Sequence, residues 1–281
     1  MFRSVVIFFT RMYRDCKMNV KKGDKKVILE LLSSCNLNCS YCFYRTSNRF
    51  HSTNFLSKKE IFALIDKMVR ERINKLVLTG GEPTLYPDFI EISEYAMLKM
   101  PKVTICANGV ILDNKLEDKI VKLNFSTYTV SIDSHIVKMH DKLRGRKGAF
   151  KKTVAFIKKL KLNNKNVSIH ITIHPENINH IEETINFCKG FSKEIVVSSI
   201  YHNKLSEHDE PKGYSLKLIN FKKKYLNSPD VILVGFTPFC ESENCLDQKS
   251  IFTINRKGEL VSCYWKKTAE RLSESINFIK L

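Results

Sequence analysis

The sequence lacks an apolar run long enough to span a bilayer, and it lacks a recognisable secretion signal. Its first residues, MFRSVVIFFTRMYRD, carry a short apolar run between arginines but no small-residue cleavage site. The nine cysteines are an odd number with uneven spacing, unlike the disulfide framework of a secreted protein. These absences predict a cytoplasmic protein without a membrane segment, whose cysteines are thiols or metal ligands.

Acidic residues are scarce, because 29 Asp and Glu stand against 47 Lys and Arg, which gives a formal net charge of +18. Such a charge attracts polyanions such as RNA, acidic peptides or membrane surfaces, and a general compositional bias toward lysine is the alternative explanation. In the densest basic stretch, residues 142–165, Phe150, Val154, Ile157 and Leu160 recur at helical spacing. This pattern predicts an amphipathic helix whose lysines form a solvated face.

Internal repeats and low-complexity segments are also absent, and strand-like segments alternate with helix-length segments from residue 27 to about residue 200. This alternation predicts an α/β fold with a parallel sheet. Ser57–Glu60 has the pattern of a capping box and predicts the start of the first helix of the alternation. The predicted strands are Lys26–Leu32, the segment before Gly80, Lys102–Gly109, Thr127–Ser134, Asn166–Ile173 and Glu194–Ile200.

The composition changes after the sixth predicted strand. Residues 1–26 are interpreted as an N-terminal extension, 27–200 as the core, 201–230 as a connector and 231–281 as a small second module. Within this module, Lys249–Trp265 reads as a β-hairpin around a turn at Gly258.

Three cysteines, Cys35, Cys39 and Cys42, follow the first predicted strand within eight positions, and no fourth cysteine accompanies them. A closed tetrahedral zinc site or a fully ligated cluster would use four ligands. Three thiolates on one loop can instead hold three irons of a cubane cluster and leave the fourth iron open to another ligand. Scattered cysteines or a zinc site are the alternatives to this interpretation.

A second motif, Gly80-Gly81-Glu82-Pro83, follows the second predicted strand. Two glycines permit close approach of the backbone to a ligand, and Glu82 can accept a hydrogen bond from a cationic amine. An ordinary turn is the alternative. The cysteines, this motif, Asn108 and Ser131 all fall at the carboxyl ends of successive predicted strands, where parallel barrels form active sites.

In combination, these motifs over residues 27–200 resemble the radical S-adenosylmethionine (SAM) superfamily. The resemblance implies a partial (β/α)6 barrel and a [4Fe–4S] cluster bound by Cys35, Cys39 and Cys42, with SAM on the open iron. It also implies cleavage of SAM to a 5′-deoxyadenosyl radical, with an electron from a flavodoxin-type or ferredoxin-type donor. Tyr41 would lie near the adenine, Gly80, Gly81 and Glu82 at the methionyl amine, Asn108 in a third-strand turn, Ser131 and Asp133 in a SAM-contacting fourth-strand motif, and Arg144 at the SAM carboxylate.

The C-terminal module carries a further cysteine pattern. Cys245 is followed by Gly258 and, after four residues, by Cys263, which resembles the opening of the SPASM extension. The later cysteines of a full SPASM module are missing, so the resemblance is to the shortened twitch form. It implies an auxiliary [4Fe–4S] cluster on Cys240, Cys245 and Cys263, and a zinc site or an unliganded trio is the alternative.

The remaining cysteines, Cys16, Cys106 and Cys188, are interpreted as small hydrophobic residues. The eight histidines show no spacing typical of a zinc site. His170 and His174 flank the end of a predicted strand, where they line either the substrate space or a solvated face.

The leading functional prediction is the modification of a ribosomally made peptide, because the C-terminal cysteine pattern resembles the start of a SPASM module. About 26 residues precede the first predicted strand, too few for a leader-binding domain, so leader recognition is expected from a separate protein or the core itself. The alternatives are biosynthesis of a sugar, nucleoside or cofactor precursor, and RNA modification driven by the basic surface.

Overall fold

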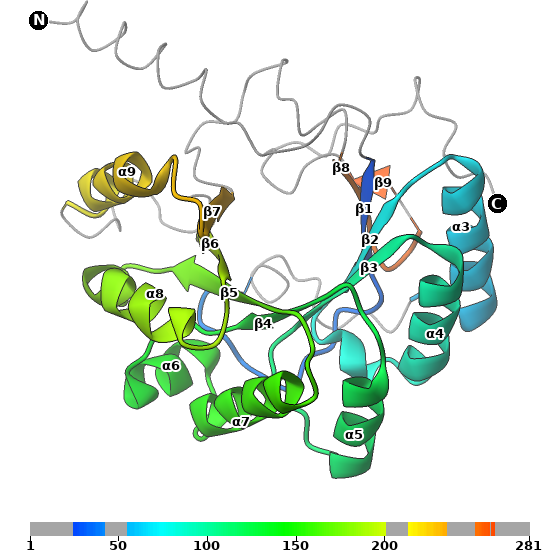
Figure 1. Ribbon diagram of the computed structural model, residues 1–281, viewed down its shortest axis with the longest axis horizontal. Helices are drawn as coiled ribbons and strands as arrows, with labels where there is room; N and C mark the ends of the chain where they lie inside the picture. Colours follow the sequence, from blue (N-terminus) through cyan, green and yellow to red (C-terminus); the bar gives the residue numbers. More distant parts are fainter. Residues whose placement is uncertain (1–24, 43–54, 201–212, 235–250, 259, 262–281) are drawn as a thin grey trace, which may run out of the picture.

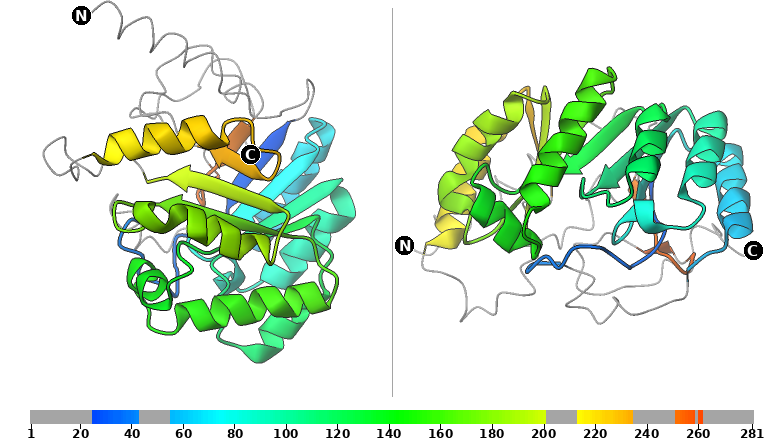
Figure 2. Two further views of the ribbon diagram at one scale, coloured as in Figure 1. Left: turned by 60° about the vertical axis from the view of Figure 1, so that its left-hand side comes forward. Right: turned by 90° about the horizontal axis from the view of Figure 1, so that it is seen from below.

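The computed structural model describes residues 25–42, 55–200, 213–234, 251–258 and 260–261. These residues form one curved sheet with helices on its convex side (Figure 1). The views in Figure 2 show that the helices follow the curve from one edge of the sheet toward the other, leaving the concave side free of described helices. The architecture is the predicted partial barrel.

The sheet has nine strands in the order β7-β6-β5-β4-β3-β2-β1-β8-β9. Neighbouring strands are parallel, except that β9 is antiparallel to β8. The strands are β1 (Lys26–Glu30), β2 (Lys75–Thr79), β3 (Lys102–Ala107), β4 (Thr127–Ser131), β5 (Val167–Ile173), β6 (Glu194–Ser199), β7 (Val231–Val234), β8 (Ile251–Ile254) and β9 (Leu260–Val261).

The connection from β1 to α3 is long and carries the cysteine segment. Helix α3 begins with the predicted capping box, in which Ser57 and Glu60 bond each other's backbone N–H groups. The predicted basic helix is α7, and the basic stretch 142–165 begins at the end of α6, before a turn at Gly145 and Gly148. The helices are α3 (Lys58–Arg70), α4 (Phe89–Lys99), α5 (Asn114–Lys122), α6 (Val137–Arg144), α7 (Ala149–Leu162), α8 (Ile181–Lys189) and α9 (Tyr214–Tyr225), with 3-10 turns η2 (Pro83–Leu85) and η3 (Ile178–His180).

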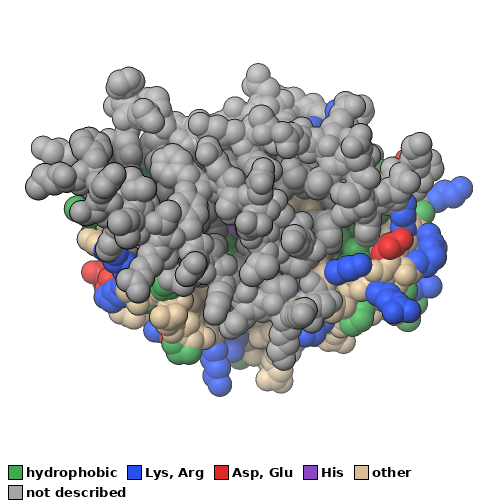
Figure 3. Space-filling view, turned by 90° about the horizontal axis from the view of Figure 1, so that it is seen from above, with side chains coloured by type: hydrophobic (Ala, Val, Ile, Leu, Met, Phe, Trp, Pro, Cys, Tyr) green, Lys and Arg blue, Asp and Glu red, His purple; other side chains and the backbone are tan. Residues whose placement is uncertain are grey.

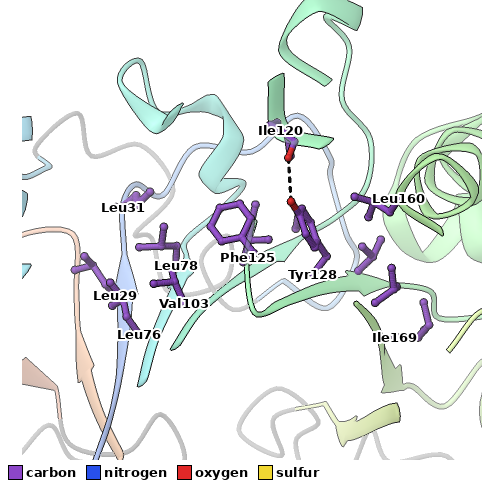
Figure 4. Close-up of a cluster of buried hydrophobic side chains, with 14 of the residues drawn as sticks. Leu29, Leu31, Leu76, Leu78, Val103, Ile120, Phe125, Tyr128, Leu160 and Ile169 are labelled. Carbon is purple, nitrogen blue, oxygen red and sulfur yellow. Dashed lines mark hydrogen bonds between the residues drawn. The ribbon is translucent and has the colours of Figure 1, made fainter. Parts of the chain in front are cut away.

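The main core lies between the sheet and the helices. Alternate strand residues such as Leu76, Leu78 and Tyr128 point to the convex side and are fully or almost fully buried there (Figure 4). The hydroxyl of Tyr128 donates to the carbonyl of Ile120 at 3.1 Å and to the carbonyl of Leu123, which secures the end of α5 to β4. This layer stabilises the barrel without occupying its concave side.

The opposite face of the same strands is polar toward the carboxyl end. Because side chains alternate along a strand, the residues between the buried apolar positions face the concave side. Toward the carboxyl ends of β2 to β6 these are Thr79, Cys106, Ser131, His170 and Ser198.

The strands after residue 230 extend the same sheet at both edges, with β7 beside β6 and β8 beside β1. The predicted hairpin is present as β8 and β9, whereas Cys16, Cys240, Cys245 and Cys263 lie outside the described residues. The division into core, connector and C-terminal module stays a prediction.

The basic composition is visible on the surface, where Lys and Arg side chains along the edges of the face in Figure 3 outnumber Asp and Glu. Within the part of the chain that the structure describes, no helix has the length and apolarity needed to cross a membrane.

Candidate active site

The three predicted cluster ligands lie on the segment that leaves the carboxyl end of β1. Cys35, Cys39 and Cys42 are half-buried free thiols. Backbone hydrogen bonds anchor the segment to the end of α6, from Asn38 N to the carbonyl of Arg144 at 3.1 Å and from Ser40 N to the carbonyl of Leu143 at 3.0 Å. The cysteine segment is therefore positioned mainly by backbone contacts that do not involve its thiols.

The second predicted motif binds the other side of the cysteine segment. Gly81 N donates to the carbonyl of Leu32 at 2.8 Å, and Glu82 N donates to the carbonyl of Ser34 at 2.9 Å. A Cβ atom at Gly80 would lie 2.4 Å from the Leu32 oxygen, and one at Gly81 would lie 2.2 Å from the Ser34 oxygen. Both glycines are thus required for the two backbones to meet, which is a structural role in addition to the predicted contact with SAM.

The carboxylate of Glu82 is almost completely buried and joins the ends of β2 and β3. It accepts hydrogen bonds from the Thr84 hydroxyl at 2.7 Å, from Thr84 N at 3.3 Å and from Asn108 N at 2.7 Å. Burial raises the pKa of Glu82, and these donors oppose that shift. A carboxylate can accept about four hydrogen bonds, so this arrangement leaves room for one more donor.

Asn108 connects the third strand to the cysteine segment. Its Nδ2 donates to Asn36 Oδ1 at 2.7 Å and lies 3.6 Å from the sulfur of Cys35. Leu37 N donates to the same sulfur at 3.4 Å. Burial raises the pKa of the Cys35 thiol to about 12, so a positively charged metal group is needed to hold this side chain as a thiolate.

The predicted SAM contacts Asp133 and Arg144 form a buried ion pair with each other. Arg144 Nη2 donates to Asp133 Oδ1 at 3.0 Å, and Arg144 Nε lies 2.8 Å from Oδ2. Thr172 N and the Tyr41 hydroxyl also donate to this carboxylate. Burial, the largest single influence, would lower the pKa of Arg144, but Asp133, Tyr41 and Cys39 together raise it above its ordinary value. Arg144 Nη1, 4.0 Å from the sulfur of Cys39, is the guanidinium nitrogen that does not bond Asp133.

The remaining predicted residues lie around this pair. The Tyr41 ring is 6.0 Å from the ring of His174 and 5.8 Å from the guanidinium carbon of Arg144. Ser131 ends β4 as the register partner of His170 on β5. His170 Nε2 lies 3.0 Å from the Ser198 hydroxyl, and burial lowers the pKa of His170 to about 4. His170 is therefore neutral at physiological pH.

The donor chemistry of the segment fits an iron–sulfur cluster. Three cysteines lie on one loop, and N–H groups from Leu37 and Asn108 point to one of their sulfurs, as is typical of cluster thiolates. Among the described residues no three Cys, His, Asp or Glu side chains converge on the position of a single metal ion. In a cubane each thiolate binds a different iron, so a wider arrangement of ligands is compatible with a cluster.

Several residues that hold the site were not singled out from the sequence. Asn36 pairs with Asn108, and Asn177 Nδ2 donates to the carbonyl of Asp133 at 2.8 Å. Gly145 has φ +62°, and a Cβ there would lie 2.0 Å from the carbonyl oxygen of Asn38. Two sequence patterns could have indicated some of these residues, namely the asparagines within CNLNC and the glycines within LRGRKG.

His140 is a further buried group of this kind. Its Nδ1 accepts a hydrogen bond from Asp133 N at 3.2 Å, and burial lowers its pKa to about 4. The residue therefore supports the Asp133 turn as a neutral imidazole.

We predict that Gly81→Ala destabilises the fold and displaces the cysteine segment, because the new methyl group would overlap the carbonyl oxygens of Ser33 and Ser34. The free energy of unfolding should fall by about 1–3 kcal/mol, as for other overpacked sites, and the iron bound per chain should fall with it. The matched control is Gly190→Ala, where the nearest atom is 3.3 Å away and φ is −64°. Equal stability and iron content in the two variants would contradict the assigned contact.

We also predict acid destabilisation between pH 6.5 and pH 4. Since the pKa of His140 is about 4 in the folded chain and 6.5 in the unfolded chain, the unfolded chain binds more protons in this window. The free energy of unfolding should thus fall as the pH drops, by about 2 kcal/mol at pH 5 for this histidine. Urea unfolding at pH 7 and pH 5 measures the effect, which His140→Asn should reduce and His180→Asn should retain. An unchanged pH response in His140→Asn would refute the assignment.

Comparison with known proteins places the chain in a family. Residues 29–188 match the radical SAM superfamily. The chain is 31% identical over 160 residues to the AdoMet-dependent heme synthase of Methanosarcina barkeri, covering 57% of this chain and 46% of the relative. It is 29% identical over 160 residues to the sporulation killing factor maturation protein SkfB of Bacillus subtilis, covering 57% and 38%. The chain thus spans less than half the length of these curated relatives.

Solved structures share the fold at lower identity. Streptococcus suis SuiB bound to the precursor peptide SuiA has a TM-score of 0.69 and 16% identity, covering 96% of this chain and 66% of SuiB. The protein anSMEcpe with bound AdoMet has a TM-score of 0.64 and 18% identity, covering 87% and 75%. Together with the match of more than half the chain, this shows that the chain belongs to the radical SAM superfamily, whose enzymes depend on S-adenosylmethionine.

Proposed function

We propose that this protein reductively cleaves SAM and uses the resulting radical to abstract a hydrogen atom from a ribosomally made peptide. The observation that supports this most is the cysteine segment, which is held between the Gly80–Glu82 turn and the end of α6 by backbone bonds on both sides. Cys35, Cys39 and Cys42 would hold a [4Fe–4S] cluster. When bound, that cluster supplies the electron that breaks the carbon–sulfur bond of SAM.

The protein's own residues would then bind and orient SAM at the carboxyl ends of β1 to β5. Glu82 retains capacity for one more donor, which suits the methionyl ammonium. A contact between Arg144 and the SAM carboxylate would use Nη1, since the Nε and Nη2 edge of the guanidinium binds Asp133. Tyr41 would flank the adenine, with Gly80, Gly81, Asn108, Ser131 and Asp133 shaping the rest of this site.

The peptide substrate is supported by the relatives rather than by the concave surface alone. SkfB is named a maturation protein, the Mycobacterium tuberculosis relative MftC is named a mycofactocin maturase, and SuiB was solved with its precursor peptide. A second candidate is a tetrapyrrole or cofactor precursor, because heme synthases and a GTP 3′,8-cyclase are also similar to this chain. RNA modification is a third candidate, which is supported only by the net positive charge of the chain.

The substrate proposal is tested by offering the anaerobically purified protein a short peptide encoded next to its gene, with SAM and dithionite. Mass loss or crosslinking of the peptide, together with 5′-deoxyadenosine, is the expected result. Formation of 5′-deoxyadenosine with a tetrapyrrole precursor and not with the peptide would favour the second candidate.

We expect the combined change Cys35→Ala, Cys39→Ala and Cys42→Ala to abolish SAM cleavage, because no thiolate remains to hold the cluster. The measurement is 5′-deoxyadenosine formed under dithionite, together with the iron bound to the cysteine segment. Cys106→Ala, on the concave face of β3, is the control and should leave both unchanged. A triple variant that still forms 5′-deoxyadenosine would refute the assignment of these ligands.

The C-terminal cysteines are proposed to hold an auxiliary cluster, which rests on their resemblance to the SPASM opening. The wild-type chain should then carry about eight irons, two cubanes of four. Replacing Cys240, Cys245 and Cys263 by Ala should leave about four irons and intact SAM cleavage, with loss of substrate conversion. Loss of zinc instead of iron would identify a structural zinc site, and unchanged metal content would show that the spacing is coincidental.

A further inference from the structure

An apolar groove lies on the convex side of the barrel, between α6 and α7, away from the concave side. Its volume is about 480 Å³, and nearly all of its accessible lining is apolar. The groove is lined by Val137 from α6 and by Phe150, Lys151, Val154, Ala155 and Lys158 from α7.

These apolar side chains are not part of the main core. On the same helix, Ile157 and Leu160 are fully buried against the sheet, whereas Phe150 and Val154 are only half-buried. Val137 is 50% exposed. The ring of Phe150 lies 5.8 Å from that of Phe187 on α8, which extends the apolar surface toward the next helix. Together these side chains leave a small apolar surface exposed on α6 and α7.

The edges of the groove carry lysine side chains that form no ion pair with a described carboxylate. Lys151 and Lys158 line the groove and are exposed, and within the described residues no ion pair reaches either of them. On the opposite side of α7, by contrast, Lys159 pairs with Glu117 and with Asp118, each at 2.7 Å.

Three acidic side chains belong to α6 and α8, and α7 carries none. Glu182 on α8 pairs with Lys224 on α9. Asp141 is engaged by the backbone N–H groups of Gly148 and Phe150 at the start of α7. Glu183 is exposed on α8, one helical turn before Phe187. The surface thus has an apolar centre and a predominantly basic rim, which complements an acidic protein.

The groove also lies next to the residues that hold the cysteine segment. Ala149, the first residue of α7, packs with Leu37 and Val110, and Cys35 and Cys39 pack against this small cluster. The next residue, Phe150, already lines the groove. A protein docked on α6 and α7 would therefore be separated from the cysteine segment by little more than the first turn of α7.

We propose that this α6–α7 groove is the docking surface for an acidic protein that donates single electrons. The inference rests on the proposed function, because each SAM cleaved to methionine and a 5′-deoxyadenosyl radical consumes one electron, and the donor is oxidised by one electron. Carboxylates of the donor would face the lysine rim, and the apolar surface around its prosthetic group would cover the groove. The net charge of +18 favours the encounter, and the groove gives it a defined place.

The proposal is tested with reduced flavodoxin and reduced ferredoxin as the probes and the anaerobically purified holoenzyme as the target. Binding is measured by titration, and 5′-deoxyadenosine is measured with each donor and separately with dithionite, a small reductant that needs no docking surface. Lys151→Glu with Lys158→Glu, and separately Ala155→Glu, should each weaken donor binding and donor-driven SAM cleavage by about ten-fold or more. Dithionite-driven cleavage should stay at the wild-type level.

The matched control is Lys115→Glu with Lys119→Glu on α5, two exposed lysines that receive the same charge change away from the groove. An equal loss in this control would show that only the total charge matters and would overturn the proposal. Wild-type binding by the groove variants, or binding of neither donor to the wild type, would also overturn it. Self-association of the wild type that is abolished by Ala155→Glu would also overturn it, because the groove would then bind a second copy of this chain. Absence of SAM cleavage with dithionite in the wild type would instead refute the proposed function, while the binding titration would still test the groove.

Discussion

The site depends on one constraint, which is that the backbone of the cysteine segment passes within hydrogen-bonding distance of two other stretches of backbone, one on each side. The segment after β1 pairs with the Gly80–Glu82 turn on one side and with the end of α6 on the other. Contacts this close exclude a Cβ atom at Gly80, Gly81 and Gly145, where it would lie 2.0–2.4 Å from a carbonyl oxygen. Backbone bonds do not depend on side-chain rotamers, so they place the thiols with little conformational freedom.

Buried polar side chains also hold the strands, α6 and the cysteine segment together. Asp133 binds Arg144, Thr172 N and Tyr41, and thereby joins β4, α6, β5 and the cysteine segment. A buried ion pair of this kind is costly to break, because the remaining partner would be an uncompensated buried charge. Glu82 plays the corresponding part between β2 and β3. Two residues expected to contact SAM are thus also structural, and substitutions at either would affect the fold and the cofactor site together.

Much of the fold could be predicted from local sequence patterns. The six core strands, the capping box at Ser57 and the convergence of Cys35, Gly81 and Asn108 follow from periodicity and from strand order. The binding partners of Asp133 and Asn36 could not be predicted, because they come from residues far apart in the sequence, such as Asn36 and Asn108, 72 positions apart. The positions of β7 and β8 at the two edges of the sheet are likewise determined by tertiary pairing. The helical pattern of Phe150 and Val154 predicted a buried face, but α7 turns only part of that face to the sheet.

The two faces of the sheet differ in what a substitution changes. On the convex face a substitution at Leu78 or Tyr128 changes packing and therefore the survival of the whole domain. On the concave face, positions such as His170 and Ser198 contribute little apolar burial but bond each other, so a change at one calls for a matching change at the other. A new substrate can then be accommodated by altering alternate residues of the same strands while the intervening ones stay constant. Such a layered sheet is well suited to diversification, and the relatives similar to this chain include proteins named for heme synthesis and for maturation of a sporulation killing factor.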